Sequence, residues 1–225
     1  MGQLIDLKRP TWVVVCREGN GFHTGQAAAA KRMFEKHGSA SWDFVCLTDN
    51  PTEDWHTPLR TDWPGWWSIL ESFYLVGAPC VLTGLDSMLC GNLSPILRVA
   101  ENCPPDVLYG IKSLANPARV WASGVTVWNG DWSFIPEQFT PEHDMSVFHG
   151  NQDYTAACVR GRSDRHLCYL QDKGVDGILS YKVNMRSKGV KTPPANARVI
   201  CFHGNPKPWD TDLPWVLEAW GLHSA

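Results

Sequence analysis

The sequence predicts an α/β fold with a central, mostly parallel sheet flanked by helices. Three observations lead to this prediction: apolar, β-branched runs recur along the whole chain, amphipathic segments separate the early runs, and strand patterns resume after each Gly- and Pro-rich stretch. At 225 residues the chain is long enough for one core of several layers. We therefore expect a single domain over residues 1–225.

Six apolar runs have the composition of buried strands. Each is short and bounded by turn residues, which is typical of strands that are covered on both faces. The runs are Trp12–Cys16, Phe44–Leu47, Cys80–Leu82, Val107–Ile111, Val125–Trp128 and Val199–Phe202. A sheet made of such strands needs helices on both of its faces.

Four segments are predicted to be helices. In residues 25–38, apolar side chains from Ala27 to Phe34 fall near helical spacing, and Gly38 is placed to end the helix. The other expected helices are Trp67–Leu75, Leu93–Asn102 and Asp153–Val159. The chain therefore begins in the order β-α-β-α-β, which is typical of a parallel sheet. Pro and Gly concentrate in the expected loops, which are Asn50–Gly65, Asn116–Pro117, Gly130–Pro141 and Lys188–Pro194.

Composition and charge argue against several classes of protein. Hydrophobic residues make up 44% of the chain and charged residues 19%, so disorder is not indicated. The net charge of −3, with scattered basic residues, offers no electrostatic surface for nucleic acid. No stretch approaches the roughly 20 apolar residues of a membrane span, and the first ten residues lack the apolar core of a signal peptide. We therefore expect a cytoplasmic protein.

The eight cysteines are expected to be reduced. Several lie inside apolar runs, where a small buried thiol is the natural interpretation. We predict in particular that Cys16, Cys46 and Cys80 are buried free thiols rather than disulfide partners.

A single carboxylate follows one of the predicted strands. In VLTGLDSMLCGNL, residues 81–93, the strand leads into Asp86 before a Gly-Asn turn. In an open α/β sheet, ligands bind beyond the carboxyl ends of the strands, so polar residues at such positions are candidates for a site. Asp86 is therefore either a ligand-binding group or a residue that caps a turn.

The segment VICFHGNPKPWD, residues 199–210, places several functional residue types after a strand. Residues two apart in a strand share a face, so His203 presents its imidazole on the same side as Cys201. Gly204 permits close backbone approach to an anion, and Lys207 supplies a positive charge. A Lys-Pro-Trp sequence alone is usually a surface turn, but this order after a strand favours a functional interpretation.

Both segments resemble the family-8 glycosyltransferases, the family that includes glycogenin. Residues 81–93 are similar to a family stretch in which a strand ends in Asp-X-Asp, and residues 199–210 are similar to the family's His-Phe-X-Gly-X-X-Lys-Pro-Trp. Gly84 stands at the first Asp, and Cys201 stands at the His. A histidine occurs two residues further along, at His203.

Four other segments resemble the same family in the same order along the chain. They are VCLTDNP at 45–51, PGWWSILESF at 64–73, WASGVTVWNGDW at 121–132 and GNQDY at 150–154. Ile69, Ala122 and Asn151 replace polar residues of the family. Each segment alone is also explained by local structure, such as a helix cap or a strand bulge. The order of all of them, from Trp12 to Trp209, favours the family.

The resemblance implies a GT-A-like fold and a metal-dependent glycosyltransferase, a hexosyltransferase that uses a nucleotide-diphosphate sugar, with UDP-sugar expected, and retains anomeric configuration. It implies Asp86 and His203 as ligands of Mn²⁺ or Mg²⁺, and Gln152 and Asp153 as catalytic residues. The implied donor-binding residues are Val15, Cys16, Asn20, Asp49, Leu85, Asp86, Ser123, Gly204 and Lys207. Because two protein ligands are too few for tight binding, we expect the metal to bind well only together with the nucleotide diphosphate.

Two alternatives stay open. The first is a nucleotide-sugar or glycan binding module that has lost turnover, which the replacements at Gly84 and Ile69 favour. The second is a viral type of enzyme that glycosylates DNA bases, which the net charge disfavours. The acceptor is accordingly a glycan, a protein or a modified nucleobase.

Overall fold

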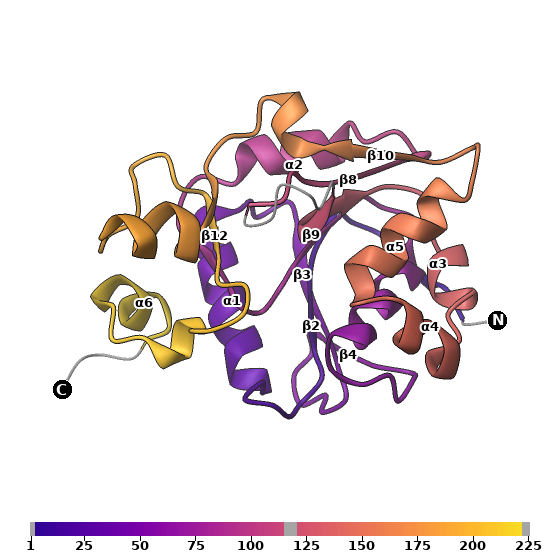
Figure 1. Cartoon of the computed structure of the whole chain (residues 1–225), viewed down its shortest axis with the longest axis horizontal. Coiled ribbons are helices and arrows are strands. Elements are labelled where there is room, and N and C mark those ends of the chain that lie inside the picture. Colours follow the sequence, from indigo (N-terminus) through magenta and orange to yellow (C-terminus); the bar gives the residue numbers. More distant parts are fainter. Residues whose placement is uncertain (1–2, 115–120, 222–225) are drawn as a thin grey trace.

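A seven-stranded sheet forms the centre of the computed structural model, which describes residues 3–114 and 121–221 (Figure 1). The strand order is β10-β8-β9-β6-β2-β3-β4. The strands are β2 (Thr11–Cys16), β3 (Asp43–Thr48), β4 (His56–Pro58), β6 (Cys80–Thr83), β8 (Val107–Ile111), β9 (Ala122–Trp128) and β10 (His166–Tyr169). Strand β9 is antiparallel to both of its neighbours, and the other pairs in this sheet are parallel. The predicted α/β fold with a mostly parallel sheet is confirmed, and β9 makes that sheet mixed.

Two smaller sheets accompany the central one. Strands β11 (Ile178–Ser180), β12 (Val199–Cys201) and β7 (Ser87–Leu89) form a three-stranded sheet in that order, and β1 (Ile5–Asp6) pairs with β5 (Leu75–Val76). The strand predicted at Val199–Phe202 therefore exists, but it lies outside the central sheet. Its partner β7 was not predicted, because an isolated three-residue strand is too short to give a periodic pattern.

The four predicted helices are present, although one of them is not an α-helix. The α-helices are α1 (Thr24–His37), α2 (Ser94–Glu101), α3 (Phe134–Glu137), α4 (Pro141–Val147), α5 (Asn151–Arg160) and α6 (Pro214–Ala219). The other helical segments are the 3₁₀-helices η1 (Gly65–Tyr74), η2 (Leu170–Lys173), η4 (Arg186–Lys188) and η5 (Pro208–Asp210) and the π-helix η3 (Tyr181–Met185). The segment predicted as a helix at Trp67–Leu75 is η1. Within the described residues, no helix has the length and apolar character that crossing a bilayer requires.

Two of the predicted loops contain regular structure. The loop Asn50–Gly65 includes β4, which pairs with β3 at the edge of the sheet, where a proline such as Pro58 is tolerated. The loop Gly130–Pro141 includes α3. The predicted loop at Asn116–Pro117 lies outside the described residues.

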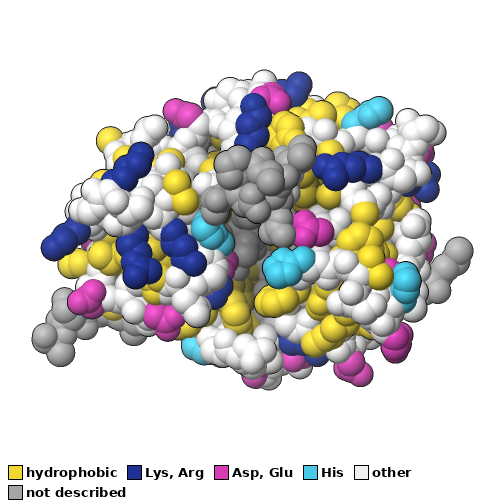
Figure 2. All heavy atoms as spheres, in the orientation of Figure 1, with side chains coloured by type: hydrophobic (Ala, Val, Ile, Leu, Met, Phe, Trp, Pro, Cys, Tyr) yellow, Lys and Arg dark blue, Asp and Glu magenta, His cyan; other side chains and the backbone are white. Residues whose placement is uncertain are grey.

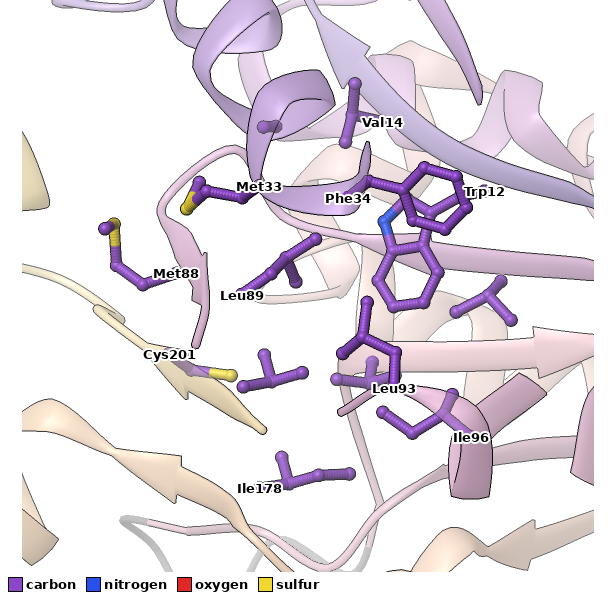
Figure 3. Packing of buried hydrophobic residues seen from close by; sticks show 14 of the residues in the cluster. Trp12, Val14, Met33, Phe34, Met88, Leu89, Leu93, Ile96, Ile178 and Cys201 are labelled. Atoms are coloured by element: carbon purple, nitrogen blue, oxygen red, sulfur yellow. The ribbon is translucent and has the colours of Figure 1, made fainter. Parts of the chain in front are cut away.

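Strand β2 shows why the predicted strands are apolar without alternation. Trp12 and Val14 face a core cluster on the side of α1 and α2, whereas Val13 faces a second cluster on the side of η1 and α5. Figure 3 shows Phe34 of α1 against Trp12, and their ring centroids are 5.3 Å apart. Because both faces of β2 are covered, every residue of the strand is buried.

All eight cysteines are free thiols, as predicted, and Cys16, Cys46 and Cys80 are buried. Burial, followed by the nearby carboxylates of Glu18 and Asp49, raises the pKa of Cys16 from 9.0 to about 12. The neutral thiol is therefore strongly preferred in the folded protein.

We expect the stability of the protein to fall at alkaline pH, partly because of Cys16. Above pH 9 this thiol ionises in the unfolded chain but stays protonated in the folded one, so the free energy of unfolding falls as pH rises from 9.0 towards about 12. The contribution is at most roughly 1.4 kcal/mol per pH unit for one thiol. Urea unfolding between pH 8 and 10 measures it. Cys16→Ala should flatten the slope, and an unchanged slope in that variant would contradict the prediction.

Candidate donor-binding site

The pairing of β7 with β12 brings together the two motifs on which the sequence prediction depends. Ser87 lies opposite Cys201 in an antiparallel register, and the Phe202 amide donates to the Asp86 carbonyl at 2.9 Å. Asp86 comes just before β7, and His203 follows β12. Two segments far apart in the sequence therefore meet at one end of the small sheet.

Asp86 and Lys207 form an ion pair. The Lys207 Nζ donates to Asp86 Oδ2, and the two side chains are 19% and 23% exposed. Asp86 was predicted to bind a metal and Lys207 to contact a diphosphate, and the structure places the two charges in direct contact. The carboxylate therefore already has a cationic partner within the protein.

His203 lies beside this ion pair and is tied to the neighbouring strand. Its Nε2 is 2.6 Å from the Ser180 Oγ at the end of β11. Burial, followed by the positive charges of Lys182 and Lys207, lowers the pKa of His203, while Asp86 acts in the opposite direction. The net lowering favours a neutral imidazole at neutral pH.

Gly204 and Lys182 complete this side of the site. Gly204 has a φ of +68°, which favours glycine, and a Cβ added there would lie 2.8 Å from Lys182 Nζ. The Lys182 ammonium therefore lies directly beside the Gly204 backbone. Lys182 was not among the predicted site residues, because the strand before it is only three residues long. Its position directly after an apolar run was the available signal.

The loop after β2 contacts the segment that contains Lys207. Asn20 lies in this loop with a φ of 53°, in the left-handed region that Asn tolerates better than most residues. The Phe22 ring lies 5.1 Å from the Trp209 ring, and Lys207 Nζ lies 5.5 Å from the Phe22 centroid. The structure therefore places the predicted Asn20 segment next to Lys207.

Three of the predicted donor-binding residues have buried side chains. Val15, Cys16 and Leu85 all pack in the hydrophobic clusters. Any donor contact from these residues would therefore involve their backbone, because their side chains are part of the core.

Asp49 holds the ends of two strands together. Its Oδ1 accepts from the Glu18 amide at 2.9 Å, and its Oδ2 lies 3.5 Å from Arg17 Nη1. Arg17 was not among the predicted site residues, although it directly follows a predicted strand. The predicted residue Ser123 lies near the start of β9, where a Cβ added to the adjacent Gly124 would lie 3.3 Å from Cys201 Sγ.

Gln152 and Asp153 lie in the first turn of α5, away from β12. Figure 2 shows a surface that is hollowed between two sides, and comparison with Figure 1 places β12 and α6 on one side and α4 and α5 on the other. Lys, Arg and His side chains gather on the first side, where acidic side chains also occur, and the second side carries His, acidic and basic side chains. A Cβ added to Gly150, next to α5, would lie 3.4 Å from the indole nitrogen of Trp66, whose side chain is 60% exposed.

The residues present do not form a complete site for a divalent cation. Nowhere in residues 3–114 and 121–221 do three His, Cys, Asp or Glu side chains come together as a metal site would require. Asp86 accepts from Lys207, and His203 is bonded to Ser180. This pair of ligands does not fit a tightly bound metal ion, and the expected dependence on Mn²⁺ or Mg²⁺ stays a prediction.

Solved structures share the fold of this chain, although no family model and no curated protein matches the sequence. The glycosyltransferase GlyE of Streptococcus pneumoniae TIGR4 has a TM-score of 0.67 and 12% identity over 96% of this chain, which spans 62% of GlyE. The galactosyltransferase LgtC, solved with donor and acceptor sugar analogues, has a TM-score of 0.65 and 12% identity over 96% of both chains. A glycosyltransferase involved in glycosylation of the major capsid of PBCV-1 has a TM-score of 0.58 and 12% identity over 96% of this chain and 100% of its own.

The chain has a GT-A fold. The fold implied by the resemblance to family 8 is therefore confirmed. In this GT-A fold β2, β3 and β6 are parallel neighbours, so Arg17, Asp49 and Asp86 all follow strands that end at the same edge of the sheet. At 12% identity the similarity establishes the fold, and the assignment of site residues depends on the contacts within this chain.

Proposed function

We propose that this protein transfers a sugar from a nucleotide-diphosphate donor, with UDP-sugar as the first candidate, to an acceptor hydroxyl. The observation that supports the proposal is the meeting of Asp86, His203, Gly204 and Lys207 at one place in a GT-A fold. A glycine in the left-handed region gives a phosphate access to the backbone, and lysine supplies charge for it.

The transfer breaks the bond between the anomeric carbon and the diphosphate oxygen, and the bonding electrons leave with the diphosphate. The acceptor oxygen forms the new bond to the same carbon from the leaving-group side, which retains configuration, and the acceptor proton passes to the departing diphosphate oxygen. Lys207 stabilises the departing diphosphate, since a fixed positive charge acts most strongly where negative charge develops. In this proposal Asp153 and Gln152 stabilise the oxocarbenium-like transition state of the sugar.

Release of nucleoside diphosphate from a panel of nucleotide sugars tests this function. UDP-glucose, UDP-galactose, UDP-N-acetylglucosamine and GDP-mannose should be incubated separately with the protein, with Mn²⁺ and with EDTA. At least one donor should release its nucleoside diphosphate above the protein-free rate, and an added sugar acceptor should increase the rate. Absence of release from every donor in both conditions would contradict turnover.

A binding protein without turnover is the second candidate, and the ion pair between Asp86 and Lys207 favours it. A carboxylate that is neutralised by lysine has less charge available for a metal that would assist the leaving group. Such a protein should gain thermal stability from a nucleotide sugar, because the ligand binds only the folded state, and yet release no nucleoside diphosphate.

Lys207→Met should weaken the binding of nucleoside diphosphate by about 10–100-fold and change nucleoside binding by less than about twofold. The variant loses a cation at the phosphates and leaves the Asp86 carboxylate, 23% exposed, without the cation that now faces it. Calorimetric titration of UDP and of uridine measures both effects. Lys191→Met, at an exposed lysine, is the control. Equal losses for the two ligands would remove Lys207 from the diphosphate site.

A further inference from the structure

The Lys207 ammonium contacts one of the two carboxylate oxygens of Asp86, at which a metal ion would otherwise bind. Its Nζ donates directly to Asp86 Oδ2. A Cβ added to Gly84 would lie 2.7 Å from Asp86 Oδ1, so a second carboxylate at that position would force Asp86 to move. The local geometry therefore suits one carboxylate with a lysine partner better than a pair of carboxylates around a metal.

A second lysine is held in place close to the first. Lys182 lies in η3, and the flanking residues fix this helix against β12. The Tyr181 ring stacks on the Phe202 ring at 4.2 Å with 9° between the planes, and Ser180 Oγ accepts from the Val183 amide and contacts His203. Because these contacts lie on both sides of Lys182, its backbone position is well defined.

Both lysines lie close to the loop that contains Gly204. Lys182 Nζ would be 2.8 Å from a Cβ on Gly204, and Lys207 is three residues further along the chain. Lys182 is half-buried and the Lys207 side chain is 19% exposed, so solvent screens both charges less than it screens a free surface lysine. Together they supply the same formal positive charge as one divalent cation.

We propose that Lys182 and Lys207 together neutralise the donor diphosphate, and that nucleotide-diphosphate binding does not require a divalent cation. This inference rests on the proposed function, because it assigns the charge at the same donor site. It adds Lys182 to the site and gives Asp86 the role of positioning Lys207 instead of binding metal.

Calorimetric titration of the full chain tests the proposal. UDP, GDP, ADP, CDP and dTDP are titrated in EDTA and again in Mn²⁺, and the tightest ligand is used for the variants. We expect the two affinities to agree within about threefold. Binding in Mn²⁺ alone would overturn the inference and leave the proposed function standing. Absence of binding to all five nucleotides in both conditions would overturn both.

Three variants at lysine positions test the role of Lys182. Lys182→Met should lower the affinity about tenfold or more, because it removes a charge at the phosphates. Lys182→Arg keeps the charge and should recover most of that loss. Lys188→Met, at an exposed lysine in the adjacent η4, should bind like the wild type. Equal affinity of Lys182→Met and wild type would overturn the assignment of Lys182.

Asp86→Asn separates the two possible roles of Asp86, which are to position Lys207 or to bind a metal ion. The two roles predict different changes in the affinity for the nucleoside diphosphate. If Asp86 positions Lys207, the amide still accepts a hydrogen bond and removes a negative charge near the phosphates, so affinity in EDTA is kept or improves. A loss of affinity of tenfold or more in Mn²⁺, with unchanged affinity in EDTA and an unchanged melting temperature, would overturn this role and favour a metal ligand.

Discussion

Asp153→Asn should lower turnover by about 10²–10³-fold and leave donor affinity within about threefold. Asp153 lies in the first turn of α5, next to Gln152, in the element that faces β12 across the hollow. The amide has nearly the shape of the carboxylate but lacks its charge. Because positive charge develops on the sugar only in the transition state, loss of the carboxylate should affect the rate much more than binding.

The measurement compares the rate of nucleoside-diphosphate release with the dissociation constant from calorimetry. Glu142→Gln is the matched control, since Glu142 is an exposed carboxylate in the first turn of the neighbouring helix α4. The control should retain wild-type turnover. If Asp153→Asn retained more than about a tenth of the wild-type rate, Asp153 would not be a catalytic residue.

Phe202→Ala should lower the free energy of unfolding by about 3–5 kcal/mol. Phe202 directly precedes His203 in the chain and is fully buried. Its ring stacks on Tyr181 and packs against Trp215. Removing the ring leaves a cavity in the contact that joins β12 to η3. Part of the cost is lost burial of apolar surface, and part is the cavity that the surroundings do not fill.

Urea unfolding monitored by circular dichroism measures this loss. Val147→Ala is the control, because Val147 is 59% exposed, and it should cost less than about 0.5 kcal/mol. Phe202→Leu keeps most of the volume and should cost clearly less than Phe202→Ala. A loss below about 1 kcal/mol for Phe202→Ala would mean that β12 and η3 do not depend on this contact.

The strand predictions succeeded where burial on both faces leaves a continuous apolar run. Strand β2 is the clearest case, since all six of its residues are buried. Some short elements were missed: β7 and β11 each contain three residues, too few for a period to be recognised, whereas β12 was predicted from the apolar run at Val199–Phe202. The same limit explains why Lys182, which follows β11, was not a candidate.

Helix η1 shows a different limit. Its sequence predicts a helix correctly, and the structure gives this helix 3₁₀ geometry with Trp67 and Leu70 buried in the second core cluster. Such tertiary contacts override the weak local preference between the two geometries.

The sequence by itself determined the α/β class, the reduced cysteines and the two motifs that contain Asp86 and Lys207, because buried strands and the residues after them have recognisable local patterns. Only the tertiary structure decided that Asp86 contacts Lys207 and that Lys182 lies beside Gly204. The reason is physical: those contacts depend on the register between β7 and β12 and on the stacking of Tyr181 on Phe202. Interactions between distant segments leave no periodic pattern within either one.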